Sequence, residues 1–76
     1  MFQDLVEYIV KSLVDNPDQV EVGTIIEDSS LMVELQVADG DIGRVIGRNG
    51  RVINAIRTLV QAVATKDGKH VTVEVV

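Results

Sequence analysis

The sequence predicts an α+β fold in which a three-stranded sheet is backed by three helices, in the order α-β-β-α-α-β. Two long segments repeat apolar residues every three or four positions, which is the spacing of an amphipathic helix. Three shorter segments are rich in β-branched residues or alternate apolar with polar residues, as strands do. A chain of 76 residues is too short for two hydrophobic cores, so we expect residues 1–76 to form one domain.

The first half of the chain predicts a helix followed by a β-hairpin. Helical spacing runs over residues 2–14 and ends before Pro17, because the residue before a proline is pushed out of the α region. A segment rich in β-branched residues predicts a strand over residues 20–26, with Gly23 as a candidate bulge. Alternation over residues 31–37 predicts a second strand, and the turn residues between the two strands favour a hairpin.

The second half predicts two helices and a last strand. Asp39 and Asp41 are typical N-cap residues and mark the start of a short helix over residues 42–46. A longer helix follows over residues 51–64 and has a broad apolar face. Valines that alternate with polar residues predict the final strand over residues 71–75.

The segment between these two helices carries the clearest functional signal, because apolar pairs flank the sequence Gly47-Arg48-Asn49-Gly50. Glycine lets the backbone turn sharply and lets another chain approach with no Cβ in the way. The start of the next helix leaves backbone N–H groups without intrahelical partners, and such groups favour a phosphate. The arrangement therefore indicates a clamp on a nucleic-acid backbone.

The net charge of -5 is unevenly distributed along the chain. Residues 1–41 contain ten acidic residues and one basic residue, whereas residues 42–76 contain two acidic and six basic residues. No acidic residue occurs from residue 42 to residue 66, and this stretch holds Arg44, Arg48, Arg51 and Arg57. Four arginines can simply solvate helix surfaces. Here they coincide with the glycine loop, and local field decides whether an anion is captured, so the distribution favours a polyanionic ligand.

The sequence Val-Ile-Gly-x-x-Gly-x-x-Ile lies between the second and third predicted helices. With this motif and this element order, the chain resembles a KH domain in its bacterial, type II arrangement. The core β-α-α-β unit would span residues 31–76, and the helix and strand of residues 1–27 would be the N-terminal extension. The chain is similar to the small stand-alone bacterial KH proteins of the KhpA type, which are described as RNA-binding proteins and RNA chaperones.

That resemblance implies a non-catalytic protein that binds single-stranded RNA in the cytoplasm and acts as an RNA chaperone or post-transcriptional regulator. It also implies a homodimer or a complex with a larger KH-domain partner, and a link to cell-wall synthesis and cell shape. An acidic protein with about four usable arginines should bind RNA weakly alone, because affinity follows the number of phosphates neutralised. A second subunit is therefore expected.

The resemblance also assigns roles to individual residues. The loop would hold the sugar-phosphate backbone of about four nucleotides. Arg51 and Arg44 would reach the same phosphates. The residues assigned to the backbone are Gly47, Arg48, Asn49, Gly50, Arg51 and Arg44. The residues assigned to an apolar groove for the bases are Ile42, Gly43, Ile46 and Ile53, of which Ile46 and Ile53 fit the core equally well.

The long second-half helix is apolar on more than one face, so part of it must pack on something other than the sheet. This second face either packs on the first helix or forms part of a dimer interface, and a short chain with surplus apolar surface favours the dimer. The residues concerned are Val52, Ala55, Leu59, Ala62 and Val63.

Composition and motifs narrow the classes of function that remain open for this chain. There is no cysteine and only one histidine, so we expect no metal site, and no motif predicts a cofactor. No nucleophile–base pair or carboxylate dyad is visible, which argues against an enzyme. The residues near the start do not resemble a secretory leader, and no apolar run approaches the length of a membrane span. Two alternatives stay open: a subunit whose KH fold mainly docks a protein partner, and a binder of single-stranded DNA.

Overall fold

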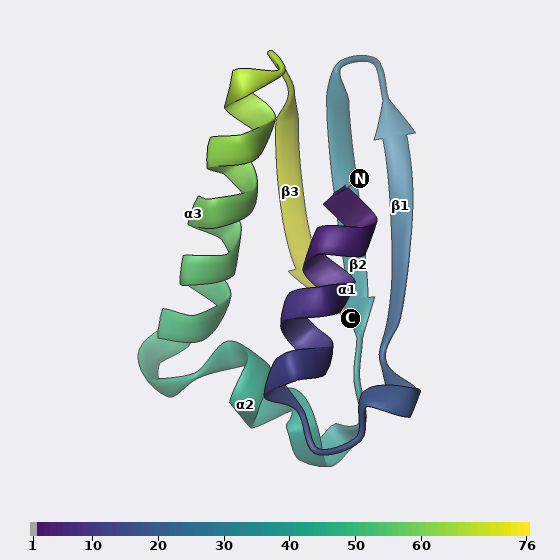
Figure 1. Cartoon of the computed structure of the whole chain (residues 1–76), viewed down its shortest axis with the longest axis vertical. Helices are drawn as coiled ribbons and strands as arrows, with labels where there is room; N and C mark the ends of the chain where they lie inside the picture. Colours follow the sequence, from purple (N-terminus) through teal and green to yellow (C-terminus); the bar gives the residue numbers. More distant parts are fainter. Residues whose placement is uncertain (1) are drawn as a thin grey trace.

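The computed structural model describes residues 2–76, and its elements follow the predicted order α-β-β-α-α-β. The α+β class with a three-stranded sheet and three α-helices is confirmed (Figure 1). Three 3-10 turns, at Pro17–Gln19, Asp39–Asp41 and Arg48–Gly50, connect the elements. The helices are α1 (Phe2–Leu13), α2 (Ile42–Ile46) and α3 (Arg51–Lys66), and the strands are β1 (Glu21–Glu27), β2 (Ser30–Gln36) and β3 (His70–Val75).

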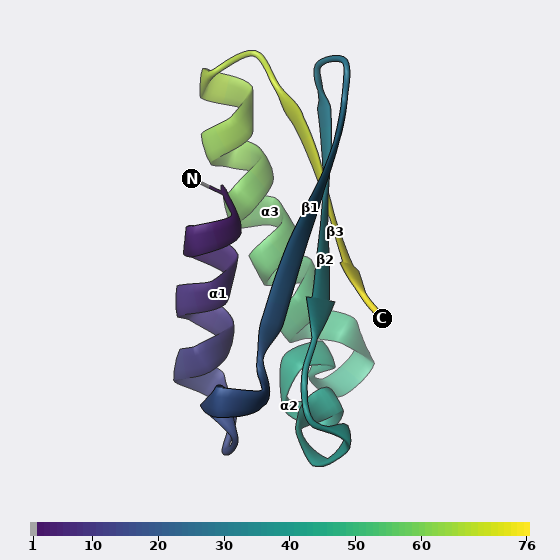
Figure 2. The ribbon, with the colours of Figure 1, turned by 90° about the vertical axis from the view of Figure 1, so that its right-hand side faces the viewer.

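The sheet has the order β1-β2-β3. β1 and β2 form the predicted antiparallel hairpin, whereas β3 lies parallel to β2. A parallel neighbour requires a crossover connection, and α2 together with α3 provides it. Figure 2 shows α1 and α3 side by side on one face of the sheet, with α2 at the end of the sheet where β2 leaves it. The two long helices therefore cover the sheet, and α2 places the loop beyond its end.

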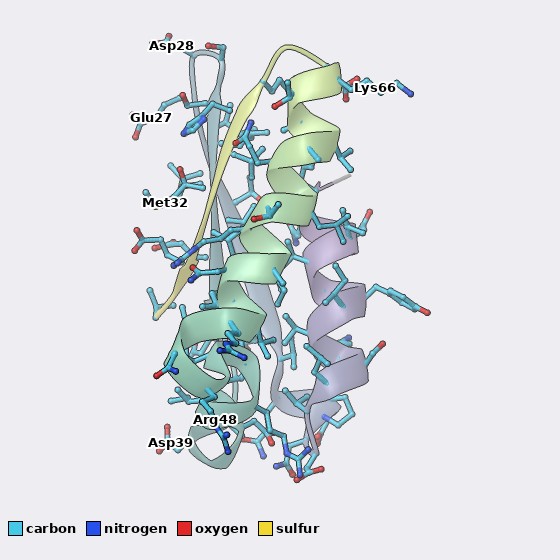
Figure 3. All side chains as sticks on the ribbon, turned by 90° about the vertical axis from the view of Figure 1, so that its left-hand side faces the viewer. Glu27, Asp28, Met32, Asp39, Arg48 and Lys66 are labelled. Atoms are coloured by element: carbon cyan, nitrogen blue, oxygen red, sulfur yellow. The ribbon has the colours of Figure 1, made fainter. Side chains whose placement is uncertain are left out.

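The core lies between the sheet and the two long helices. Strand residues alternate, so Val33, Leu35 and Val73 point inward and are buried against α1 and α3. The opposite face is open to solvent, and Figure 3 shows Glu27 and Met32 projecting from it, away from the helices. The strands contain no lysine or arginine, so this open face is unfavourable for a polyanion.

One detail of the hairpin differs from the sequence prediction. The predicted bulge at Gly23 is wrong, because the register runs without interruption and places Gly23 opposite Glu34. The turn lies where the sequence predicts it, since Glu27 pairs with Ser30 and leaves two residues between the strands. The first of these, Asp28, has φ 49°, a left-handed conformation that aspartate adopts more readily than most residues.

The predicted N-caps of α2 are also wrong, because within residues 2–76 no side chain caps that helix. The side chain of Asp41 is 1% exposed and accepts hydrogen bonds from the connection after α1. The donors are the backbone N–H groups of Asp15 (3.1 Å) and Asn16 (3.0 Å) and the amide of Asn16 (3.2 Å). Asp41 thereby ties the end of α1 to the start of α2.

These contacts lower the pKa of Asp41 below its ordinary value. The hydrogen bond from the Asp15 backbone has the largest effect on this pKa, the bonds from Asn16 and the charge of Arg44 act in the same direction, and burial opposes them. A carboxylate whose pKa is lower in the folded state stabilises the fold above its unfolded pKa. That stability is lost as the pH falls through the folded pKa.

We therefore expect Asp41→Asn to lower the free energy of unfolding at neutral pH, because the new amide group would oppose the N–H donors of Asp15 and Asn16. In urea titrations the difference from wild type should shrink below about pH 4, where the aspartate of the unfolded chain becomes protonated. The exposed Asp39 provides the matched control, Asp39→Asn, which should show neither effect. A difference at Asp41 that does not depend on pH would contradict this account.

Candidate nucleic-acid interface

The loop between α2 and α3 connects the two helices within four residues, from Gly47 to Gly50. The N–H of Gly47 donates to the carbonyl of Gly43 (2.9 Å) and closes α2, and the N–H of Gly50 donates to the carbonyl of Gly47 (3.2 Å). Gly47 has φ 76° and ψ 171°, Asn49 has φ 57°, and Gly50 has φ 74°. Three of the four residues thus adopt positive φ, which most side chains disfavour.

The two glycines are needed for different reasons. A Cβ on Gly47 would lie 2.5 Å from Cγ2 of Val52 and 2.8 Å from its backbone nitrogen, so a side chain does not fit. A Cβ on Gly50 would have its nearest neighbour, the amide of Asn54, at 3.5 Å, which is ordinary contact. Gly47 is therefore required by close packing as well as by its dihedral angles, whereas Gly50 is required by its positive φ alone.

Arg48 and Asn49 form the exposed tip of this loop. Figure 3 shows Arg48 at the opposite end of the molecule from the hairpin turn at Asp28. The loop leads directly into α3, and within residues 2–76 no side chain caps the start of that helix. The first N–H groups of α3 and the positive end of its dipole thus lie beside an arginine and an amide, an arrangement that favours an anion.

The other arginines of the acid-free stretch divide into two near the loop and one away from it. Arg44 is exposed on α2, and its Nε lies 3.4 Å from Oδ2 of Asp15 in the connection after α1. Arg51 is the exposed first residue of α3 and lines the grooves along that helix. Arg57 instead donates to the carbonyl of Val73 (3.0 Å) and holds α3 to β3. Arg44, Arg48 and Arg51 therefore remain near the loop.

The residues assigned to a base groove do not all reach the surface. Ile42 is 38% exposed, Gly43 is exposed and Ile46 is half-buried. Ile53 is 4% exposed and belongs to the core, so it offers no surface to a base. The sequence left a core role open for both Ile46 and Ile53, and in the structure Ile53 is the one buried in the core.

The second apolar face of α3 is only partly covered. Val52 and Val63 are half-buried against the core, whereas Ala55, Leu59 and Ala62 are exposed, Leu59 by 50%. Between α1 and α3 lies a groove of about 380 Å³, lined by Ile9, Leu13, Arg51, Val52, Ala55, Ile56 and Leu59. Packing on the first helix therefore accounts for part of this face and leaves an apolar strip that begins at Arg51, beside the loop.

Comparison with known proteins identifies the family. The model of the KhpA/KhpB KH domain matches residues 3–75. The chain belongs to this KH-domain family. Proteins named RNA-binding protein KhpA are similar over nearly their whole length: that of Caldanaerobacter subterraneus subsp. tengcongensis is 53% identical over 73 residues, covering 96% of this chain and 97% of the relative. That of Clostridium perfringens is 47% identical over 74 residues, covering 97% and 99%.

A solved structure agrees on the fold. The crystal structure of Era from Aquifex aeolicus superposes with a TM-score of 0.65 at 18% sequence identity and covers 99% of this KH chain but 30% of Era. At this identity the likeness shows the fold alone.

The predicted resemblance to KhpA-type KH proteins is confirmed. The prediction that the chain is not an enzyme agrees with its relatives, which are named for RNA binding and for no reaction.

Two features of the KH site escape sequence reasoning: the buried Asp41 and the pairing of Asp15 with Arg44. Both join segments that are more than twenty residues apart in the chain. Among the described residues there is no group of three or more histidine, cysteine, aspartate or glutamate side chains that could hold a metal ion. Within the same part of the chain, no helix has the length and apolar character needed to cross a membrane.

Proposed function

We propose that this KH protein binds single-stranded RNA, without catalysing a reaction, by gripping the RNA backbone with the loop from Gly47 to Gly50. The observation that carries the proposal is the geometry of the loop, which presents Arg48 and Asn49 to solvent beside the uncapped start of α3 in the described chain. The similar proteins named for RNA binding support it. We further propose that residues 31–76 form the RNA-binding unit and residues 1–27 its extension.

The contacts divide by chemistry. Gly47 and Gly50 supply the positive φ angles that shape the loop around the sugar-phosphate backbone, and Arg48 supplies a charge-assisted hydrogen bond to a phosphate. Asn49 adds a neutral contact, and Arg51 extends the cationic surface along the start of α3. Together they would hold about four nucleotides, which is the usual span of a KH loop.

Arg44 and the exposed part of α2 complete the site. Arg44 would add a further phosphate contact from α2. The bases would lie on Ile42, Gly43 and Ile46, because these residues keep exposed surface beside the loop. Ile53 has no place in this groove, since it is buried in the core.

This site should bind RNA weakly in a single subunit. It offers three arginines in a chain of net charge -5, and RNA affinity is low when few phosphates are neutralised. A second subunit would double the cationic surface. We therefore propose that the apolar strip of α3, formed by Ala55, Leu59 and Ala62 with Val52 and Val63 beside it, is a homodimer interface.

The dimer predicts a specific defect. Leu59→Asp should prevent self-association, because it places a charge at the centre of the exposed strip. A dimer with a Kd of about 1 μM corresponds to about 8 kcal/mol of association free energy, so sedimentation at concentrations well above this range should separate dimeric wild type from the monomeric variant. Ile25→Asp is the matched control, since Ile25 is 43% exposed on the opposite face of the sheet. Monomeric wild type at these concentrations would refute the interface.

A larger KH-domain protein is the second candidate for this strip, and a partner-docking subunit is the second candidate function. The apolar groove between α1 and α3 favours it, because such a groove suits a protein partner better than RNA. The cation at the tip of the loop argues against docking as the main role. On the family resemblance we also propose a role as an RNA chaperone or post-transcriptional regulator, a cytoplasmic location and a link to cell wall and cell shape.

Crosslinking with sequencing of bound RNA, at stated salt, tests the proposal. Wild type should recover RNA, and a variant with acidic residues at positions 48 and 49 should not. Single-stranded DNA of the same sequence serves as a competitor, because preference for RNA requires contacts to the 2′-hydroxyl. Equal recovery of RNA by wild type and loop variant would remove the loop assignment, and stronger competition by DNA would favour the single-stranded DNA alternative.

A further inference from the structure

We infer that Asp15 limits the affinity of the loop for RNA by competing with a phosphate for Arg44. This inference rests on the proposed function, because it concerns an acidic side chain placed beside one of the three arginines assigned to the RNA backbone. Oδ2 of Asp15 lies 3.4 Å from Nε of Arg44. The two side chains are 69% and 58% exposed, so the pair stands at the surface where RNA would arrive.

The position of Asp15 does not depend on its own carboxylate. Its backbone N–H donates to Oδ1 of the buried Asp41 (3.1 Å), and the backbone N–H of Asn16 donates to Oδ2 of the same residue (3.0 Å). These bonds hold the connection after α1 against the start of α2 through backbone groups. We call these two backbone bonds to Asp41 the strap. The carboxylate of Asp15 takes no part in the strap and lies beside Arg44.

The pair contributes little to the stability of the fold. Ion pairs between exposed side chains are screened by solvent and have small net effects on unfolding. The ion pair between Asp15 and Arg44 instead affects the affinity for RNA. A phosphate that approaches Arg44 must share or displace the carboxylate of Asp15, and the two anions repel each other. Removing one unit charge about 4 Å away changes an affinity in water by about fivefold.

The substitution Asp15→Asn separates these effects, because it removes the charge and leaves the backbone bonds to Asp41 in place. We expect it to raise the affinity for a single-stranded RNA oligonucleotide of randomised sequence by about fivefold at low salt, with a smaller gain at higher salt. The matched control is Asp18→Asn, which removes the same charge from the 3-10 turn of the same connection. It should change the affinity by less than about twofold. Equal gains from the two variants would overturn the inference.

A double-mutant cycle tests whether Asp15 acts through Arg44. If the carboxylate of Asp15 competes with a phosphate for Arg44, Arg44→Gln should cost more RNA affinity in the Asp15→Asn background than in wild type. Only in that background is Arg44 fully available to the phosphate. If Asp15→Asn raises the affinity as much when Arg44 is already Gln, Asp15 acts through the general field and the inference is wrong. Urea titrations should show unchanged stability in Asp15→Asn, which confirms that the strap remains formed.

The outcomes also separate this inference from the proposed function. If wild type binds the oligonucleotide no better than a variant with aspartates at positions 48 and 49, the loop assignment fails and the inference fails with it. If binding depends on the loop but Asp15→Asn has no effect on the affinity, the inference alone is overturned. Binding that depends on the loop and rises in Asp15→Asn but not in Asp18→Asn supports both.

Discussion

The double substitution of Arg48→Asp and Asn49→Asp should reduce RNA affinity by at least about a hundredfold, because it turns a loop of charge +1 into one of charge −2. Both side chains are exposed, so no core contact is lost. Asn49 has φ 57°, and aspartate tolerates this left-handed conformation nearly as well as asparagine. The fold should therefore survive while the phosphate contacts are replaced by repulsion.

The control for this variant must carry the same charge change at another place. Ser29→Asp with Lys66→Asp also changes the net charge by three units, at exposed positions. Figure 3 places Lys66 and the hairpin turn at the far end of the molecule from Arg48. Fluorescence anisotropy with labelled RNA at two salt concentrations should show a loss of less than about tenfold for the control. Similar losses in the two variants would indicate attraction by the overall field rather than by the loop.

Gly47→Ala should be the most destabilising single substitution in the loop. A methyl group there meets Val52 at 2.5 Å and 2.8 Å, and φ 76° with ψ 171° is a conformation that only glycine adopts readily. Strain of this kind costs about 1–3 kcal/mol, and relief of the clash adds to it, so a loss of about 2–4 kcal/mol is expected. That is a large part of the stability of a small domain.

Gly50→Ala is the matched control for this effect. Its φ is similar at 74°, but the nearest atom to an added Cβ is 3.5 Å away, so only the dihedral strain of about 1 kcal/mol should remain. Urea titrations of both variants measure the two free energies of unfolding. Equal losses would show that the contact with Val52 does not constrain the loop.

Much of the fold follows from local patterns in the sequence. Periods of two and of about 3.6 residues predict the strands and the long helices, because each period sets which side chains share a face. The hairpin and the position of the loop follow from turn residues and glycines. The bulge at Gly23 does not follow, because a glycine permits a bulge without requiring one, and the β1–β2 register leaves no extra residue.

The site could be predicted only in part. The loop is continuous in sequence, so its four residues necessarily lie together. Ile53 and Arg57 follow the loop closely in the chain, yet one turns into the core and the other binds the edge of β3. Periodicity alone does not decide between two apolar faces of α3, because the choice depends on where α1 and the sheet lie.

The sequence by itself determines the class of the fold, the family and the residues of the KH loop, because these depend on local periodicity, glycine conformation and a contiguous motif. Only the tertiary structure decides which charges are free to act. Asp41 turns away from its own helix to bind Asp15 and Asn16, and Asp15 thereby comes to lie beside Arg44. These contacts join segments more than twenty residues apart, and no local pattern encodes their distance.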